Sequence, residues 1–222
     1  MTLTAPRMTA AIVLAGGRAS RFGSDKLAAP MPDGRSVLTH AVAAVADVAD
    51  LVAVVVSTER PLPLGLPPVV VVVRDRAPFH GPAAGLLDGL EAIGATADSL
   101  VIVAAGDMPW MVPDVLRLLL DALAAEPTMF CARLGSPTME GPAVLLPCTL
   151  RLGAARAAAR RAVADEDSRL RHLIGGLATV FVDRERWSPI DPDGWTARDV
   201  DRPADLGEGP AEVGFARPGE HP

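Results

Sequence analysis

The loop at residues 14–26, LAGGRASRFGSDK, carries the side chains of this sequence that are best suited to phosphate chemistry. Gly16 and Gly17 have no side chains, so backbone N–H groups can approach a ligand closely there. Arg21 and Lys26 follow and would balance phosphate charge. Neither the Walker spacing GxxxxGK[ST] nor the dinucleotide spacing GxGxxG is present. The loop therefore predicts a nucleotide cradle that differs from both common phosphate loops.

Lys26 is unusual because lysine is otherwise absent from this sequence. Of the 21 basic residues apart from histidine, it is the only lysine, and the rest are arginines. A lysine ammonium is a compact point charge and arginine is a wide planar fork, so the two differ most where a phosphate sits in a tight pocket. This retained lysine favours a role in phosphate binding over the alternative, a glycine turn with exposed basic residues.

Carboxylates occur at two places where a metal ion could be held. Asp107, in the segment AAGDMP, directly follows an apolar run. The end of a buried strand is where a hard oxygen ligand for Mg²⁺ would lie, although an Asx-turn or a helix cap would also explain this aspartate. Asp199 and Asp201 are two residues apart on an extended stretch, so both could reach one cation. A capped final helix explains that segment equally well.

The elements that must position these residues alternate between two periodicities. Apolar runs predict buried strands at 10–15, 51–56, 69–73 and 100–105, and helical spacing predicts helices at 36–48, 81–93 and 114–125. The valine run at 69–73 predicts a central parallel strand covered on both faces. After residue 126 the expected elements are strands at 128–132, 143–146 and 178–182 and a helix at 150–163.

This alternation predicts a fold of the α/β class. We expect a three-layer, Rossmann-like, mostly parallel sheet with helices on both faces and ligands at the carboxyl ends of the strands. One domain would span residues 9–206, between a short tail at 1–8 and a mobile tail at 207–222 that is rich in Gly, Pro and charge.

Composition excludes several classes of function. The net charge of −6 argues against a nucleic-acid partner. No apolar run approaches the roughly 18 residues that span a bilayer, and no signal-peptide pattern is present, so we expect a cytoplasmic protein without a membrane partner. The two cysteines, Cys131 and Cys148, are too few for a disulfide framework and are expected to be buried.

The motif LAGGxxSRxGxDK resembles the signature of the nucleotidyltransferase superfamily with a GT-A-like fold, in the form of its MobA-like molybdenum cofactor guanylyltransferases. GPAAGL at 81–86 is similar to the family's GPLAGL segment, AAGDMP to its DMP or DTP segment, and DVDRPADL at 199–206 to its DVDTPEDL segment. The segment EGPAVLLP at 140–147 keeps only part of a family stretch that usually carries a histidine or an aromatic residue.

The resemblance implies roles for individual residues. It places Leu14, Ala15 and Gly16 against the base and ribose, and Gly17, Arg21 and Lys26 on the triphosphate. It makes Asp107 the magnesium ligand, with Asp201 as a second contact to the metal. It also adds Ser57, Asp75 and Gly81 to the nucleotide site.

The implied reaction transfers GMP from Mg-GTP to the terminal phosphate of molybdenum-bound molybdopterin and releases pyrophosphate. GTP, Mg²⁺ and a molybdopterin-type substrate are the expected partners, together with enzymes that make or accept the molybdenum cofactor. Two alternatives stay open: a related transferase that uses CTP or another nucleotide with a different phosphorylated acceptor, and a nucleotide-binding protein without turnover.

Overall fold

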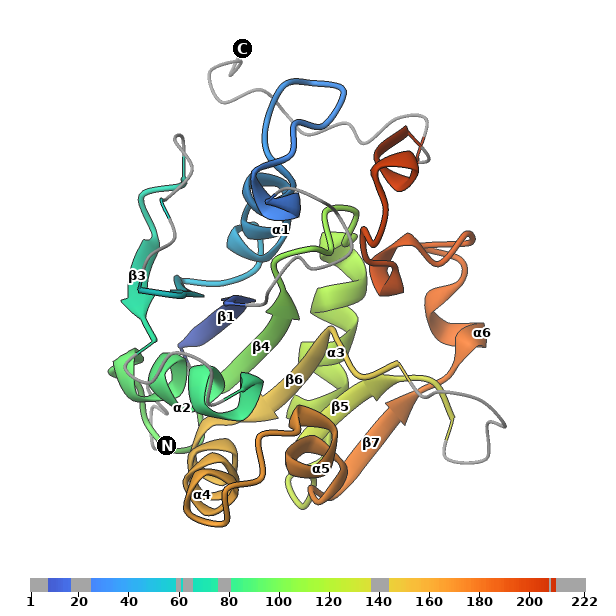
Figure 1. Cartoon of the computed structure of the whole chain (residues 1–222). Helices are drawn as coiled ribbons and strands as arrows, with labels where there is room; N and C mark the ends of the chain where they lie inside the picture. Colours follow the sequence, from blue (N-terminus) through green and yellow to red (C-terminus); the bar gives the residue numbers. More distant parts are fainter. Residues whose placement is uncertain are drawn as a thin grey trace.

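The computed structural model describes residues 8–16, 25–58, 61, 66–75, 81–136, 144–207 and 209–210. In these ranges the chain forms a seven-stranded sheet with the order β3-β2-β1-β4-β6-β5-β7 (Figure 1). The strands are β1 (Thr9–Ala15), β2 (Leu51–Val56), β3 (Val70–Arg74), β4 (Leu100–Ala105), β5 (Cys131–Leu134), β6 (Cys148–Arg151) and β7 (Thr179–Val182). β6 runs antiparallel to both of its neighbours, and all other pairs are parallel.

Helices cover both faces of this sheet. They are α1 (Val37–Ala46), α2 (Pro82–Ala92), α3 (Pro113–Ala125), α4 (Leu152–Ala164), α5 (Leu170–Gly175) and α6 (Arg184–Trp187), with 3₁₀ turns η1 (Lys26–Ala28), η2 (Trp195–Ala197) and η3 (Pro203–Gly207). Along β1, Ala11 and Val13 pack with α1, while Ala10 and Ile12 pack with α2. A parallel strand that is buried on both faces reads as a continuous apolar run, which is how its sequence predicted it. The predicted three-layer α/β fold is confirmed.

The prediction of a central strand at 69–73 is wrong in one respect. The strand exists as β3, but it pairs only with β2 at the end of the sheet, and Val71 is 45% exposed. A run of valines reports β propensity, which an edge strand satisfies as well as a central one. The run therefore fixes the type of element and leaves its place in the sheet open.

The prediction of a strand at 143–146 is also wrong. Val144 and Leu145 lie in a loop that ends at the cis peptide bond between Leu146 and Pro147, and β6 begins only at Cys148. The residues expected to open a helix at 150 instead finish β6, and α4 starts at Leu152. The sequence of β6, CTLR, hides its nature because the buried residues Thr149 and Arg151 interrupt the apolar pattern.

Three further expectations concern the cysteines, membrane-spanning helices and the domain limits. Both cysteines are free and buried, as expected. No helix in the described ranges is long and apolar enough to cross a membrane. The domain limits stay predictions, since residues 1–7, 208 and 211–222 lie outside the described chain.

Candidate active site

The carboxyl ends of the parallel strands meet at one edge of the sheet, and Lys26 reaches this edge from η1. Asp25 caps that turn, because its side chain accepts a hydrogen bond from the backbone N–H of Leu27 at 3.1 Å. A short polar side chain at this position stabilises the first turn and fixes where the next residue points. Asp25 therefore has a local structural reason to precede Lys26.

The Lys26 ammonium lies among oxygen atoms from distant parts of the chain. Nζ is 2.6 Å from Asp107 Oδ2 and 3.7 Å from Asp201 Oδ1, and it donates a hydrogen bond to the carbonyl of Val200 at 3.0 Å. The Lys26 and Asp107 side chains are about one-fifth exposed, and Asp201 is 60% exposed. We call Lys26, Asp107, Asp199 and Asp201 the carboxyl-edge cluster.

Asp107 is held at this edge by the residue before it. The backbone N–H of Gly106 donates to the carbonyl of Leu14 at 2.9 Å, which extends the pairing of β4 with β1. A Cβ atom at position 106 would stand 3.0 Å from Leu38 Cδ1, so glycine permits this close approach. The turn after β4 thereby aims the next side chain out of the sheet edge.

The late segment is tied to Asp107 through one buried residue. Val200 donates its backbone N–H to the carbonyl of Asp107 at 2.8 Å while its own carbonyl accepts from Lys26. Asp205 then accepts from the N–H groups of Asp201 and Arg202, at 2.8 and 2.7 Å. The capped final helix is present as the 3₁₀ turn η3, and the same segment carries the Asp201 carboxylate to Lys26, while a cation at Asp199 and Asp201 stays a prediction.

The carboxyl-edge cluster is not electrically balanced, because three carboxylates share one ammonium group. Desolvation acts to lower the pKa of Lys26, but the ion pair with Asp107 and the charges of Asp201 and Asp199 outweigh it and raise that pKa. Desolvation and then the neighbouring Asp201 and Asp107 raise the pKa of Asp199. The excess of negative charge is a condition that an added cation would relieve.

This donor set fits magnesium in a particular way. In the described part of the chain, no group of three or more His, Cys, Asp or Glu side chains could hold a metal by itself. Mg²⁺ commonly binds through one or two carboxylates and completes its shell with water and substrate phosphates. Asp107 and Asp201 both approach Lys26, so they could hold a Mg²⁺ ion that a nucleotide helps to bind.

The remaining predicted nucleotide residues are spread along the same edge. Leu14 and Ala15 end β1, Gly16 directly follows it, and Ser57 and Asp75 follow the paired strands β2 and β3. Gly81 precedes α2 with a φ of +83°, and a Cβ atom there would lie 2.4 Å from Ser168 Cβ. The positive φ and this contact both require glycine. Gly17 and Arg21 lie outside the described residues.

Sequence reasoning missed three contributors near this edge. Val200 acts through its backbone, so no side-chain pattern could reveal it. Ser168 packs against the start of α2, and Arg133 lies on β5; only the arginine left a signal, as a charge inside an apolar strand.

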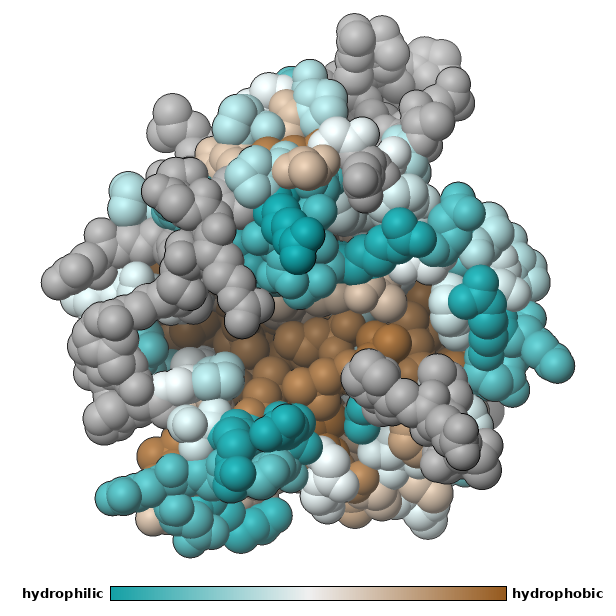
Figure 2. Space-filling model, turned by 45° about the vertical axis from the view of Figure 1, so that its right-hand side comes forward, coloured by the Kyte–Doolittle hydropathy of each residue, from teal (hydrophilic) through white to brown (hydrophobic). Residues whose placement is uncertain are grey.

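Part of the sheet next to the cluster is open. Figure 1 shows that α2, α4 and α5 gather toward one end of their face of the sheet, and Figure 2 shows a recessed hydrophobic surface between hydrophilic borders. Leu14, Leu145 and Leu146 are partly buried hydrophobic residues that pack on this side.

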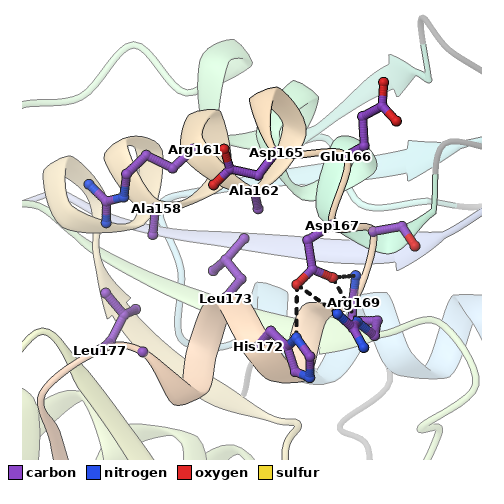
Figure 3. A pocket seen from close by; sticks show the side chains of 12 residues that line it. Ala158, Arg161, Ala162, Asp165, Glu166, Asp167, Arg169, His172, Leu173 and Leu177 are labelled. Carbon is purple, nitrogen blue, oxygen red and sulfur yellow. Dashed lines mark hydrogen bonds and ion pairs between the residues drawn. The ribbon is translucent and has the colours of Figure 1, made fainter.

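A second concavity, of about 570 Å³, lies between α4 and α5 (Figure 3). In it, Asp167 accepts hydrogen bonds from Arg169 Nε and contacts His172 Nδ1, both at 2.8 Å. We call these three residues the helix-end cluster. The hydrogen bonds from Arg169, followed by that of His172, hold the pKa of Asp167 well below its usual range. This carboxylate already has its partners.

A Rossmann-like sheet whose carboxyl edge presents one lysine among aspartates is the arrangement expected of a protein that binds the phosphates of a nucleotide. Residues 11–180 match the model of the MobA-like NTP transferase domain, and the chain belongs to this family. The protein is accordingly a nucleotidyltransferase.

Relatives agree with this assignment. The chain is 33% identical over 202 residues to a probable molybdenum cofactor guanylyltransferase of Chloroflexus aggregans, an alignment that covers 90% of this chain and 92% of the relative. It is 36% identical over 109 residues to the protein of the same name from Mycobacterium tuberculosis, across 49% of this chain and 53% of that one.

Solved structures support the fold. Molybdopterin-guanine dinucleotide biosynthesis protein A from Archaeoglobus fulgidus superposes with a TM-score of 0.66 at 20% identity, over 90% of this chain and 96% of that chain. A 2-C-methyl-D-erythritol 4-phosphate cytidylyltransferase from Thermus thermophilus gives a TM-score of 0.63 at 20% identity, over 91% and 96%.

Proposed function

We propose that the protein transfers GMP from Mg-GTP to the terminal phosphate of molybdenum-bound molybdopterin and releases pyrophosphate. The observation that carries the proposal is the carboxyl-edge cluster, in which Lys26 and Asp107 lie 2.6 Å apart at the end of the glycine loop. The names of the relatives support the nucleotide and the acceptor.

The proposed reaction needs no protein nucleophile. An oxygen of the acceptor phosphate attacks the α-phosphorus of GTP, a new P–O bond forms, and the bond to the β-phosphate breaks, so that pyrophosphate leaves with its electron pair. The attacking oxygen is already ionised, so the protein has to position the two anions and neutralise their charge. This need matches a site built from an ammonium group, backbone N–H groups and carboxylates.

Three residues of the carboxyl-edge cluster have a defined task in this proposal. Lys26 donates to phosphate oxygens of the nucleotide, and its present contact with Asp107 is exchanged or shared when phosphates enter. Asp107 holds Mg²⁺, and Asp201 supports the same ion. The metal supplies charge neutralisation for the phosphates. Asp75, Ser57 and Gly81 line the nucleotide half, while the acceptor occupies the open surface beside β6.

The decisive experiment measures transfer of radiolabel from the α-phosphate of GTP to molybdopterin, with parallel reactions that use CTP, ATP and UTP. We expect GTP to be preferred, pyrophosphate to appear in equal amount, and EDTA to stop the reaction. A preference for CTP would assign the protein to the cytidylyl-transferring alternative. Nucleotide binding without any transfer would favour a protein that has lost turnover. The expected cytoplasmic location stays a prediction.

A further inference from the structure

Arg133 is a buried cation on the half of the sheet that the proposed nucleotide site does not use. Its residue is only 8% exposed. Arg133 pairs with Cys148 on β6, and Cys148 pairs with Val103 on β4, two residues before that strand ends. The arginine therefore lies near the same carboxyl edge as Asp107, on the far side of β4 from β1.

The contacts of Arg133 use only part of its guanidinium group. Nε and Nη2 both donate to the carbonyl of Val144, at 3.2 and 3.1 Å, and the group lies 5.7 Å from the centre of the Phe181 ring. In the part of the chain that the structure describes, Nη1 makes no hydrogen bond and Arg133 has no carboxylate partner. The fully buried side-chain nitrogen and oxygen atoms without a partner there are Thr149 Oγ1 and Trp187 Nε1, so Nη1 of Arg133 keeps some exposure to solvent.

A second buried arginine shows what a purely structural role looks like. Arg151 is 7% exposed and lies on β6, at the opposite edge of the sheet. Nε donates to Met129, and Nη2 donates to Leu123 and Glu126, at 2.8 to 3.1 Å. These carbonyls surround the carboxyl end of α3, where a cation is favoured by the helix dipole. Arg151 therefore donates to carbonyls of three residues, whereas two donors of Arg133 share the single carbonyl of Val144.

We infer that Arg133 is a specificity-determining residue that binds the anionic group of the acceptor, of the phosphate monoester class. This inference rests on the proposed function for the identity of the acceptor. Carbonyls from three residues satisfy Arg151, whereas Arg133 keeps donor capacity on Nη1, and the planar fork of arginine suits phosphate oxygens. The two hydrogen bonds to Val144 hold the guanidinium still and fix the loop that leads through Leu146 to β6.

The test compares Arg133→Met, which keeps the length and loses the charge, with Arg133→Lys, which keeps the charge, and with Arg151→Lys as the matched control. In the transfer assay, we expect Arg133→Met to raise the KM for molybdopterin about 10- to 100-fold, the equivalent of one charged hydrogen bond. The KM for GTP should stay within about twofold of wild type, because charge contacts far from the nucleotide do not reach it. Arg133→Lys should be intermediate.

A second measurement does not depend on turnover. Inorganic phosphate is titrated at constant ionic strength, with Mg-GTP present, and the melting temperature is followed. We expect stabilisation of wild type and of Arg151→Lys, and a loss of it in Arg133→Met.

The two measurements separate the inference from the proposed function. Wild-type protein that transfers nothing to molybdopterin defeats the proposed function, and the phosphate titration then decides on Arg133 alone. An unchanged phosphate response in Arg133→Met overturns the inference even if transfer is observed. If the methionine variant fails to fold, Arg133→Lys with wild-type KM for the acceptor and a wild-type phosphate response overturns it as well.

Discussion

Two groups of charged side chains on this protein differ in how well their charges are matched. In the helix-end cluster, the Asp167 carboxylate contacts the Arg169 guanidinium and the His172 ring, both at 2.8 Å (Figure 3). In the carboxyl-edge cluster, one ammonium group faces three carboxylates, and the pKa of Asp199 is raised by burial and by its acidic neighbours. The paired charges of the helix-end cluster need no ligand. The excess of carboxylates in the carboxyl-edge cluster is instead typical of a functional site.

The two clusters also differ in which parts of the chain supply their residues. The helix-end cluster comes from residues 167–172, so a single turn builds it. The carboxyl-edge cluster joins positions 26, 107, 199 and 201, which only the complete sheet brings together. A site that depends on the whole fold is lost when any one of its supports moves.

The largest effect is expected from Lys26. Lys26→Ala should reduce transfer from Mg-GTP by about 10³-fold or more, because it removes a positioned charge that acts on the phosphates in a partly buried site. Circular dichroism should show that the fold survives. Label transfer and nucleotide binding measure the loss.

Lys26→Arg is the sharper control for the same position. It retains the charge, but the wider fork should not fit between Asp107 and the carbonyl of Val200, so we expect at least about a tenfold loss. Full activity in this variant would mean that only the positive charge matters. The site would then not require the compact ammonium group of lysine. Undiminished turnover in Lys26→Ala would refute the assignment of the active site.

How far the sequence predicts the molecule depends on the half of the sheet. β1, β2 and β4 were predictable within a residue or so, because parallel strands buried on both faces are uninterrupted apolar runs. β5 and β6 were not, because they have only four residues each and carry the polar residues Arg133, Thr149 and Arg151 inward. The strand expected at 128–132 is β5 at Cys131–Leu134, whereas the strand expected at 178–182 is found as β7 at Thr179–Val182. Arg133 and Arg151 donate hydrogen bonds to carbonyls that are distant in the chain, and a local pattern cannot show such partners.

The residues of the candidate site can likewise be divided into those that the sequence predicted and those that it did not. Lys26 and Asp107 were predictable as neighbours because each follows a strand that ends at the same edge. Asp201 was predicted, from its spacing and a family resemblance, as a second contact to the metal; its contact with Lys26 and the role of the Val200 backbone were not predicted. Hydrogen bonds of the main chain carry no residue type, so sequence alone could not place them.

A smaller effect, with opposite signs for stability and activity, is expected from Asp199→Asn. Removing one of three crowded carboxylates should stabilise the fold at pH 7, by about 0.5 kcal/mol since the group is near the surface. Transfer should fall less than in Asp107→Asn, which removes the proposed metal ligand. Thermal unfolding and label transfer over a range of Mg²⁺ concentrations measure both.

The stability gain expected from Asp199→Asn should depend on pH. The pKa of Asp199 in the folded protein is raised above 3.8, so its ionised form opposes folding above that pKa, and the penalty disappears as the pH falls through it. The difference in melting temperature between Asp199→Asn and wild type should therefore shrink on acidification. A difference that stays constant with pH would show that the carboxylates do not repel one another.

The smallest effect is expected from Asp167→Asn, the matched change in the helix-end cluster. Its carboxylate is paired at the surface, and such pairs contribute little, so transfer from Mg-GTP and the Mg²⁺ requirement should equal those of wild type. The melting temperature should drop slightly, and added salt should reduce the drop because exposed charges are screened. A loss of transfer comparable to that of Asp199→Asn would mean that a balanced cluster can also serve the reaction, and the distinction between the two clusters would fail.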